Sequence, residues 1–296
     1  MSSSPIKKVA AIHDLSCIGR CSLTVILPIL SCLEIQACPL PTAVLSTHPG
    51  GFSDVVFHDC TPQIAPFAAH WRREAVEFDA LYSGYLASEQ QIELVARFMD
   101  DFSANHPLVL VDPVMGDDGQ LYSICTAAMK ERMLSLVQKA GIITPNYTEA
   151  CFLLNEPWQP TVTRLADMEP WLRRLSDLGP AQVVVTGIPL PDDQIATLGF
   201  DRLTRQSWQL INDLIPARYP GTGDVFASVL LGRLLAGFSL PVAIRDAADF
   251  VASAVRLSVA SGAPRREGIL LESCLPRLCR GLVAPSTFAP EEPDHE

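Results

Sequence analysis

Residues 219–237 have the sequence YPGTGDVFASVLLGRLLAG. Two glycines, a threonine and an aspartate stand directly before a run that would be apolar on nearly every side of a helix. A helix with that pattern is buried, and bare glycines at its amino end leave the first-turn N–H groups open to an anion. The stretch therefore predicts a buried helix whose amino end, Gly221–Asp224, faces a bound anionic group.

This motif differs from two common phosphate loops. The GxxxxGK[ST] loop is absent, and Phe226 occupies the third glycine position of a dinucleotide-binding loop. A plain helix start capped by Thr222 or Asp224 would explain one acid and one glycine, but not both glycines beside the acid. Phosphoryl transfer needs such amide donors, together with a base that takes the proton of the attacking hydroxyl. We expect Asp224 to be that base, and Gly221, Thr222 and Gly223 to form the anion hole.

Alternating strand and helix patterns surround this stretch. Short, continuously apolar runs are typical of parallel strands that are covered on both faces. They occur at 9–12, 108–111, 141–143 and 183–185, with a weaker candidate at 78–86. Helical patterns occur at 22–33, 89–102, 126–139, 165–178, 224–236, 240–260 and 270–278, and residues 196–201 and 207–212 resemble paired edge strands. The order predicts an α/β fold, a three-layer α/β/α sandwich with a mostly parallel central sheet.

Composition limits the classes of function. The chain has 296 residues, 48% of them hydrophobic, and a net charge of −11, which argues against a surface that binds duplex nucleic acid. Nine cysteines include no CxxC pair, and His13, Cys17 and Cys21 lack a fourth metal ligand, so reduced thiols are expected. No signal peptide or membrane span is predicted. We expect a cytoplasmic protein with one domain over 1–280 and a disordered acidic tail over 281–296.

Polar residues follow each predicted strand. The strands are followed by Asp14, by Tyr85, by Asp112, by the group from Thr144 to Glu149, and by Thr186 with Gly187. Polar residues often simply end strands, but the carboxyl ends of parallel strands share one edge, where ligands bind. Five such groups on one edge favour a site. Carboxylates that converge there repel unless a cation joins them, so Asp112 and Glu149 are candidate Mg²⁺ ligands.

Several of these motifs together resemble the ribokinase-like superfamily. They are GTGD at 221–224, DPVMGD at 112–117 and TPNYTEACFL at 144–153. Further stretches resemble its pyridoxal kinase branch, namely AIHDLSCIGRCSL at 11–23, STH at 46–48 and SGYL at 83–86. The similarity covers about residues 6–275.

The resemblance implies ATP-dependent phosphorylation of the 5′-hydroxymethyl group of pyridoxal, pyridoxamine or pyridoxine. It implies Mg²⁺, with a monovalent cation in some members, and a homodimer without the separate β-lid of sugar kinases. The residues that would contact ATP and its metal are Asp112, Glu149, Thr144, Asn146, Thr186, Gly187 and Tyr122. Those that would surround the substrate are Asp14, Gly19, Thr47, Tyr85 and Asp224.

Two positions depart from the family pattern, and two other functions stay open. Position 14 is an aspartate where many relatives have serine, and Pro49 follows STH where relatives often have threonine. A negative Asp14 could pair with a protonated ring nitrogen or an amine. Hydroxymethylpyrimidine kinase, which performs the same chemistry, and a nucleotide-binding sensor without catalysis are the alternatives. HDLSCIGRCSL argues against the first, and the retained Asp224 argues against the second.

Overall fold

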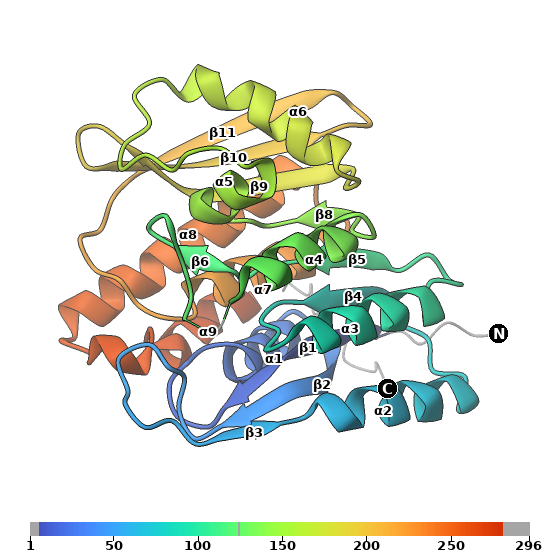
Figure 1. Cartoon of the computed structure of the whole chain (residues 1–296). Helices are drawn as coiled ribbons and strands as arrows, with labels where there is room; N and C mark the ends of the chain where they lie inside the picture. Colours follow the sequence, from blue (N-terminus) through green and yellow to red (C-terminus); the bar gives the residue numbers. More distant parts are fainter. Residues whose placement is uncertain (1–5, 124, 281–296) are drawn as a thin grey trace, which may run out of the picture.

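The computed structural model describes residues 6–123 and 125–280. Its main feature is a nine-stranded sheet with the order β11-β10-β9-β8-β5-β4-β1-β2-β3, whose six central strands are parallel (Figure 1). The strands are β1 Lys7–Ser16, β2 Ile35–Leu45, β3 Phe57–Asp59, β4 Ala80–Ser83, β5 Leu108–Val111, β8 Ile142–Ile143, β9 Gln182–Leu190, β10 Gln194–Asp201 and β11 Gln206–Asp213. A small hairpin, β6 Gly116–Asp117 with β7 Gln120–Leu121, stands apart. The predicted acidic tail lies outside the described residues.

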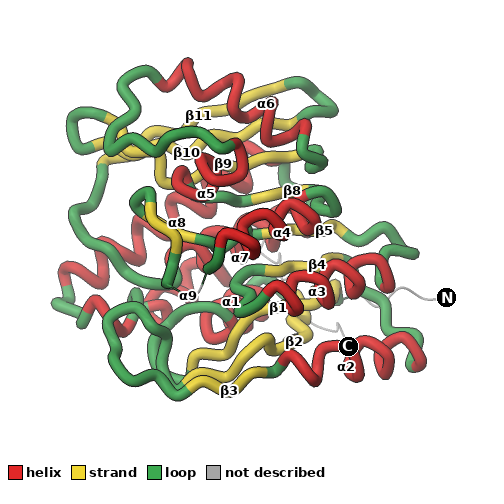
Figure 2. Tube along the Cα trace, viewed as in Figure 1, coloured by secondary structure: helices red, strands yellow, loops and turns green. Residues whose placement is uncertain are grey.

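Helices cover both faces of the sheet (Figure 2). Successive residues of a strand point to opposite faces, and in β1 Ala10 and Ile12 join one core while Val9 and Ala11 join the other. The first core packs against α2 Thr61–Arg73, α3 Glu89–Asp101, α4 Ala127–Val137, α5 Tyr147–Leu154 and α6 Glu169–Asp177. The second packs against α1 Leu23–Cys32, α7 Thr222–Leu235, α8 Leu240–Ala260 and α9 Leu271–Arg280. The predicted three-layer sandwich is confirmed.

The helix α7 is as buried as its sequence predicts. Ten of its residues are buried, from Val225 through Arg233 together with Leu235. The helix packs against α1 and α8, so one apolar segment fills the centre of a layer. This position holds the amino end of α7 firmly against the sheet.

Some elements differ from the sequence-based expectation. β1 continues past Ile12 to Ser16, with an irregular register between His13 and Leu15, so Asp14 lies within the strand. β2 was not predicted, because Pro39 and Pro41 argue against a central strand. Both prolines lie in the part of β2 that pairs only with β1, since β3 pairs with β2 from Ala43 onward.

Two further predictions had the wrong boundaries. The strand predicted at 183–185 continues through Thr186 and Gly187 to Leu190, with a register irregularity opposite Ala196 and Leu198. The helix predicted at 165–178 is divided into a 3₁₀ turn, Leu165–Met168, and α6. The helices α2 and α5 were not predicted. None of the helices in the described ranges is long and apolar enough to cross a membrane.

Candidate active site

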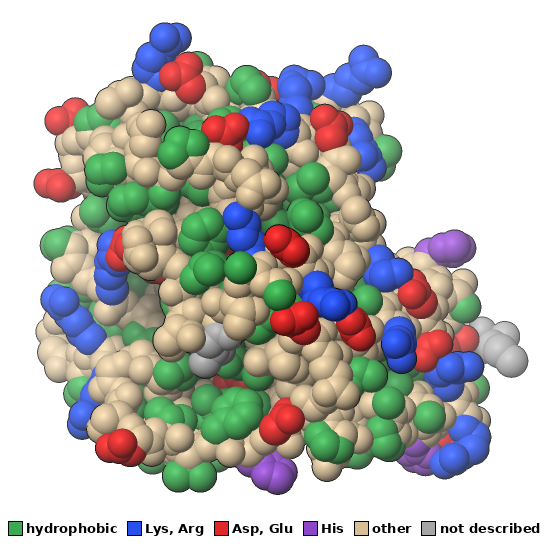
Figure 3. Space-filling view, in the orientation of Figure 1, with side chains coloured by type: hydrophobic (Ala, Val, Ile, Leu, Met, Phe, Trp, Pro, Cys, Tyr) green, Lys and Arg blue, Asp and Glu red, His purple; other side chains and the backbone are tan. Residues whose placement is uncertain are grey.

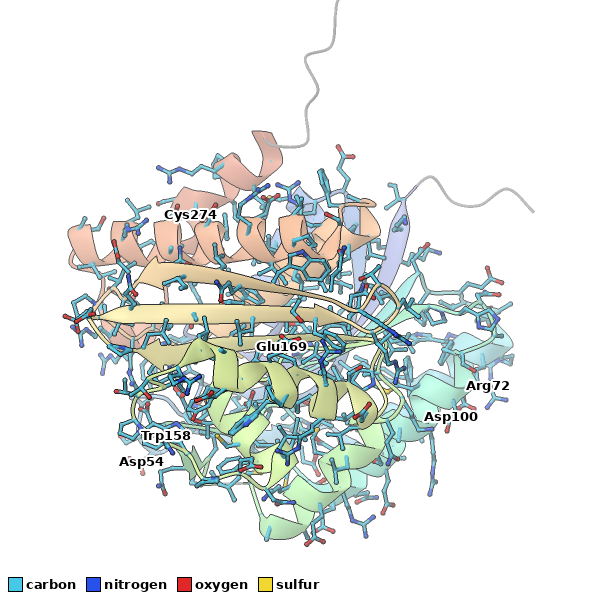
Figure 4. The ribbon with its side chains drawn as sticks, turned by 90° about the horizontal axis from the view of Figure 1, so that it is seen from above. Asp54, Arg72, Asp100, Trp158, Glu169 and Cys274 are labelled. Carbon is cyan, nitrogen blue, oxygen red and sulfur yellow. The ribbon has the colours of Figure 1, made fainter. Side chains whose placement is uncertain are left out.

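The carboxyl ends of the parallel strands define one edge of the molecule. Figure 4 shows Asp54, which follows β2, and Trp158, which follows α5, at one end of the fold. Arg72 and Asp100, near the carboxyl ends of α2 and α3, lie at the opposite end. Helices that return antiparallel to the strands produce this separation. All the strand-end residues predicted from the sequence therefore share the first of these edges.

The amino end of α7 is built from glycine. Gly221 is the N-cap, with a left-handed φ of 80°, and no side chain caps the helix. The predicted alternative, a cap by Thr222 or Asp224, is wrong, because the Thr222 hydroxyl donates to the Tyr219 carbonyl and Asp224 lies inside the first turn. A Cβ on Gly221 would lie 2.2 Å from the Arg20 carbonyl oxygen. The first-turn N–H groups therefore have no side-chain partner, as an anion site requires.

Asp224 is held by a segment far away in the sequence. Its Oδ2 accepts a hydrogen bond from the Ser22 backbone N–H at 2.8 Å. Burial raises the pKa of Asp224 to about 7, the Ser22 hydrogen bond opposes that rise, and the charge of Asp14 adds to it. A carboxylate with a pKa near neutrality is suited to accept a proton at physiological pH.

Asp112 lies next to the same turn. A Cβ on Gly223 would be 4.0 Å from its Oδ2. Asp112 is 6% exposed, and burial, followed by the charges of Glu149 and Asp224, raises its pKa well above the usual range. The Thr144 hydroxyl opposes that rise. Three acids converge here, so a cation bound between them would stabilise their charged forms.

Glu149 has a structural role as well as a charge. Its Oε1 accepts from the Met115 N–H at 3.1 Å and its Oε2 from the Asn146 N–H at 2.8 Å. The Asn146 side chain in turn accepts from the Glu149 N–H at 2.9 Å, which completes a capping box at the start of α5. Burial is the main cause that raises the pKa of Glu149 to about 8. Both of its oxygens therefore hold backbone groups of the site.

A Mg²⁺ ion fits this donor set only with help from a ligand. The described residues contain no cluster of three His, Cys, Asp or Glu side chains that could hold a metal ion by themselves. Mg²⁺ commonly takes one or two protein carboxylates and completes its shell with water and substrate phosphates. Asp112 is the side chain that could supply such a ligand. Both oxygens of Glu149, the other predicted ligand, already accept backbone N–H groups.

The hairpin β6–β7 lies over the acids. Its two-residue turn has positive φ at Asp118 and Gly119, as a type I′ turn requires. Gly119 donates to the Thr148 hydroxyl, and Asp118 forms an ion pair with Arg218, which closely precedes the Gly221 turn. Tyr122 follows the hairpin and remains 43% exposed. The structure thus places Tyr122 where a ligand at the site could contact it.

The remaining residues predicted to contact the nucleotide lie at the adjoining strand ends. Asn146 and Thr186 form an isolated parallel bridge, and the Thr186 N–H donates to the Pro145 carbonyl at 3.0 Å. Asn146 also donates its side-chain amide to the Gly116 carbonyl. Gly187 is exposed with a φ of 70°, and nothing lies within 4 Å of a Cβ at this position.

The residues predicted to contact the substrate include Asp14 and its neighbour Tyr85. Asp14 is 4% exposed and its Oδ2 accepts from the Ser16 hydroxyl at 2.9 Å. The pKa of Tyr85 is raised by burial and then by the charge of Asp14, so the two are neighbours. Thr47 is half-buried directly after β2. Gly19 has a φ of 95°, and a Cβ there would meet the His48 ring at 2.2 Å.

Sequence reasoning missed two contributors to this site. The Ser22 backbone N–H, which holds Asp224, has no signature in a sequence. His48 was noted only as part of STH, yet it is buried and ties two loops together. Its Nδ1 accepts from the Gly50 N–H at 3.0 Å, so its Nε2 carries the proton and donates to the Arg266 carbonyl at 2.6 Å.

The Ser83 hydroxyl near these strand ends is buried and has no hydrogen-bond partner among the described residues. Burial lowers the pKa of His13 to about 3, so its ring is neutral, and it packs edge-on against Tyr82. A buried polar group without a partner is rare in folded proteins. The Ser83 hydroxyl is therefore consistent with a ligand at this edge.

The uncapped amino end of a buried helix, Asp224 in its first turn and Asp112 beside it thus meet at one edge of the sheet of an α/β/α fold. The family model described as phosphomethylpyrimidine kinase matches residues 30–267. The chain belongs to this family of ribokinase-like kinases, which is the phosphomethylpyrimidine and pyridoxal kinase family.

Solved structures of related proteins share the whole fold. A candidate phosphomethylpyrimidine kinase from Bacteroides thetaiotaomicron, crystallised with pyridoxal, is 42% identical, with a TM-score of 0.88 over 92% of this chain and 96% of its own. Pyridoxal kinase from Lactobacillus plantarum is 30% identical, with a TM-score of 0.84 over 94% and 98%. At 21% identity, a likeness of fold alone, pyridoxal kinase from Leishmania donovani in complex with ADP and pyridoxamine has a TM-score of 0.83 over 92% and 95%.

Sequence alignments with curated relatives are shorter. The hydroxymethylpyrimidine/phosphomethylpyrimidine kinase of Bacillus subtilis is 33% identical over 191 residues, which are 62% of this chain and 66% of that protein. The chain spans 59% of the pyridoxine/pyridoxal/pyridoxamine kinase of Bordetella avium. These relatives are named for substrates with different rings, a pyrimidine and a pyridine, so the family defines the reaction more closely than the substrate.

Proposed function

We propose that this protein phosphorylates the 5′-hydroxymethyl group of a vitamin B6 compound, with ATP as the phosphoryl donor. The observation that carries the proposal is the position of Asp224, with a pKa of about 7, in the first turn of an uncapped buried helix beside Asp112. The pyridoxal in the related Bacteroides structure supports a pyridine substrate. The product would be the corresponding 5′-phosphate.

The arrangement suggests how each group acts. Asp224 takes the proton of the substrate hydroxyl as its oxygen bonds to the γ-phosphorus. The bond from that phosphorus to the β–γ bridging oxygen breaks, and ADP leaves. The N–H groups of Thr222 and Gly223 face the charge on the transferred phosphoryl group. A Mg²⁺ ion near Asp112 would neutralise the phosphates, while Thr144, Asn146, Thr186, Gly187 and Tyr122 would contact the nucleotide.

A second candidate has support from the comparisons. The matching family model is described as phosphomethylpyrimidine kinase, and the Bacillus subtilis relative acts on hydroxymethylpyrimidine by its name. The reaction would be the same, since that compound also carries a hydroxymethyl group. Only the ring contacts around Asp14, Thr47 and Tyr85 would differ.

One set of assays tests these proposals. ATP consumption is measured with pyridoxal, pyridoxamine, pyridoxine and hydroxymethylpyrimidine, and the products are identified by mass spectrometry. We expect turnover with a B6 compound at least tenfold above that with the pyrimidine. The reverse ranking would favour the second candidate, and ATP binding without turnover of any of the four would favour a sensor.

The expected homodimer and cytoplasmic location stay predictions. Light scattering of the purified chain measures the mass in solution, and fractionation of the source cells locates the protein. Figure 3 shows Lys and Arg side chains interspersed with Asp and Glu on the face it presents, and no single basic patch stands out. That distribution is consistent with a small-molecule ligand, as opposed to a polyanion.

A further inference from the structure

Asp14 is a buried carboxylate that the phosphoryl transfer itself does not use. It is 4% exposed and lies at the irregularity of β1 between His13 and Leu15. Such an irregularity redirects a side chain relative to the regular alternation of a strand. Here the Asp14 carboxylate lies close enough to Asp224 for its charge to act on that base. A second acid beside the general base therefore needs an explanation.

No lysine or arginine of the described residues pairs with Asp14, although the nearby His48 favours its charged form. None of the ion pairs among residues 6–123 and 125–280 includes it. Arg20, a basic side chain of the neighbouring loop, instead binds Glu272, with 2.8 Å between Nε and Oε2, and donates to the Glu267 carbonyl. Hydroxyl groups of Ser16 and Ser22 hydrogen-bond to Asp14. Hydroxyls offset only part of the free energy needed to bury a carboxylate, and a cation would offset more.

The region also contains a buried hydroxyl without a hydrogen-bond partner in the described part of the chain. The Ser83 hydroxyl is 1% exposed and has no partner, and Ser83 ends the strand β4 that neighbours β1. This hydroxyl lies at the same strand ends as Asp14. It is consistent with a polar ligand at this part of the site.

We propose that Asp14 binds a cationic amino group of the substrate, so that the enzyme prefers pyridoxamine to pyridoxal and pyridoxine. The proposal rests on the function proposed above. Among the three compounds, pyridoxamine alone carries an aliphatic ammonium group at neutral pH. A carboxylate and an ammonium group form a charge-assisted hydrogen bond, which is about twice as strong as a neutral one.

The two acids are linked through one residue. Ser22 joins them, because its backbone N–H donates to Asp224 and its side chain hydrogen-bonds to Asp14. In pyridoxamine the aminomethyl and hydroxymethyl groups are attached to adjacent ring carbons. A molecule whose hydroxyl reaches Asp224 therefore carries its ammonium group one ring position away, where Asp14 is the neighbouring carboxylate.

The same argument separates pyridoxamine from the pyrimidine substrate. Hydroxymethylpyrimidine also has an amino group next to its hydroxymethyl group. That group is conjugated with the ring and is uncharged at neutral pH, so it can donate a hydrogen bond but brings no positive charge. Selection by charge thus predicts a higher kcat/KM for pyridoxamine than for the pyrimidine. Selection by a hydrogen-bond donor alone predicts similar kcat/KM values for both compounds.

The test compares kcat/KM for the four compounds in the full chain and in Asp14→Asn, which keeps the shape and removes the charge. We expect the wild-type value to be highest for pyridoxamine. In Asp14→Asn it should fall about 10- to 100-fold for pyridoxamine, the range for a hydrogen bond between charged groups, and less than about threefold for pyridoxal. Asp79→Asn is the matched control, because Asp79 accepts from the Lys8 N–H at the opposite strand ends. It should leave the ranking unchanged.

The outcomes distinguish the two proposals. No turnover of any B6 compound by the wild type refutes the proposed function. Turnover with equal losses for all three compounds in Asp14→Asn, or a wild type that prefers pyridoxal tenfold, refutes the role of Asp14 alone. If Asp14→Asn does not fold, as judged by circular dichroism, Asp14→Ser serves as the second variant, and the wild-type ranking still decides the matter.

Discussion

The Asp224→Asn variant should be more stable than the wild type and nearly inactive. The change keeps an oxygen that can accept from the Ser22 N–H, which Asp224 now binds at 2.8 Å. It removes a carboxylate whose pKa burial raises from 3.8 to about 7. A group with a raised carboxyl pKa opposes folding wherever the unfolded chain is ionised, so its removal stabilises the fold.

The magnitude follows from the pKa. Each unit corresponds to about 1.4 kcal/mol, so a rise of about three units is about 4 kcal/mol. Because Asp224 keeps partial contact with solvent, we take roughly half of this, about 2 kcal/mol. Below pH 3.8 the proton is bound in both states and the effect is absent. Between pH 3.8 and about 7, the free energy of unfolding of the wild type falls relative to that of Asp224→Asn. Above about pH 7 the difference between the two proteins is constant.

Thermal unfolding at pH 4, 5, 6, 7 and 8 measures the effect, with ATP turnover assayed in parallel. At about 2 °C per kcal/mol, the Tm of Asp224→Asn should exceed that of the wild type by about 4 °C at pH 8 and converge with it towards pH 4. Turnover should fall about 10²- to 10⁴-fold. Asp213→Asn, at the exposed end of β11, is the control and should change neither quantity. A Tm difference that is constant with pH, or near-normal turnover, would refute the assignment of a buried base.

Three further predictions follow from the same site. The kcat/KM of the wild type should fall about tenfold per pH unit below about pH 7, because protonated Asp224 cannot act as a base, and a profile that is flat from pH 5 to 8 would contradict this. Gly221→Ala should lower the free energy of unfolding in denaturant by about 3 kcal/mol or more, because the residue has a φ of 80° and the new Cβ would lie 2.2 Å from the Arg20 carbonyl oxygen. Gly237→Ala is the control. Its φ is 86° but the space around it is open, so it should lose only about 1 kcal/mol. Removal of Mg²⁺ with EDTA should abolish turnover, and Asp112→Asn should raise the Mg²⁺ concentration needed for half-maximal rate about tenfold; equal requirements in both proteins would exclude Asp112 as a ligand.

Local sequence patterns were sufficient for the α/β/α layers and for the buried helix α7 with its uncapped amino end. Continuous apolar runs marked five of the parallel strands, and the glycines before α7 marked its exposed amino end. β2 was not predicted, because prolines argue against a strand. Pro39 and Pro41 are tolerated because this part of β2 pairs with β1 alone, which the sequence does not show. The left-handed turn at Gly221 could not be derived from local patterns, because it accompanies the close approach of the Arg20 carbonyl.

The hydrogen bonds and pKa values of the acids in the site followed only from the tertiary structure. The sequence by itself determined which residues are acids and that the strand ends bring them to one edge, since these follow from residue type and local periodicity. It did not determine that Ser22 holds Asp224, that Glu149 accepts from the Met115 and Asn146 amides, or that Ser16 and Ser22 hydrogen-bond to Asp14. Burial and hydrogen bonds set a pKa, and both depend on segments that are distant in the chain and meet only in the folded protein.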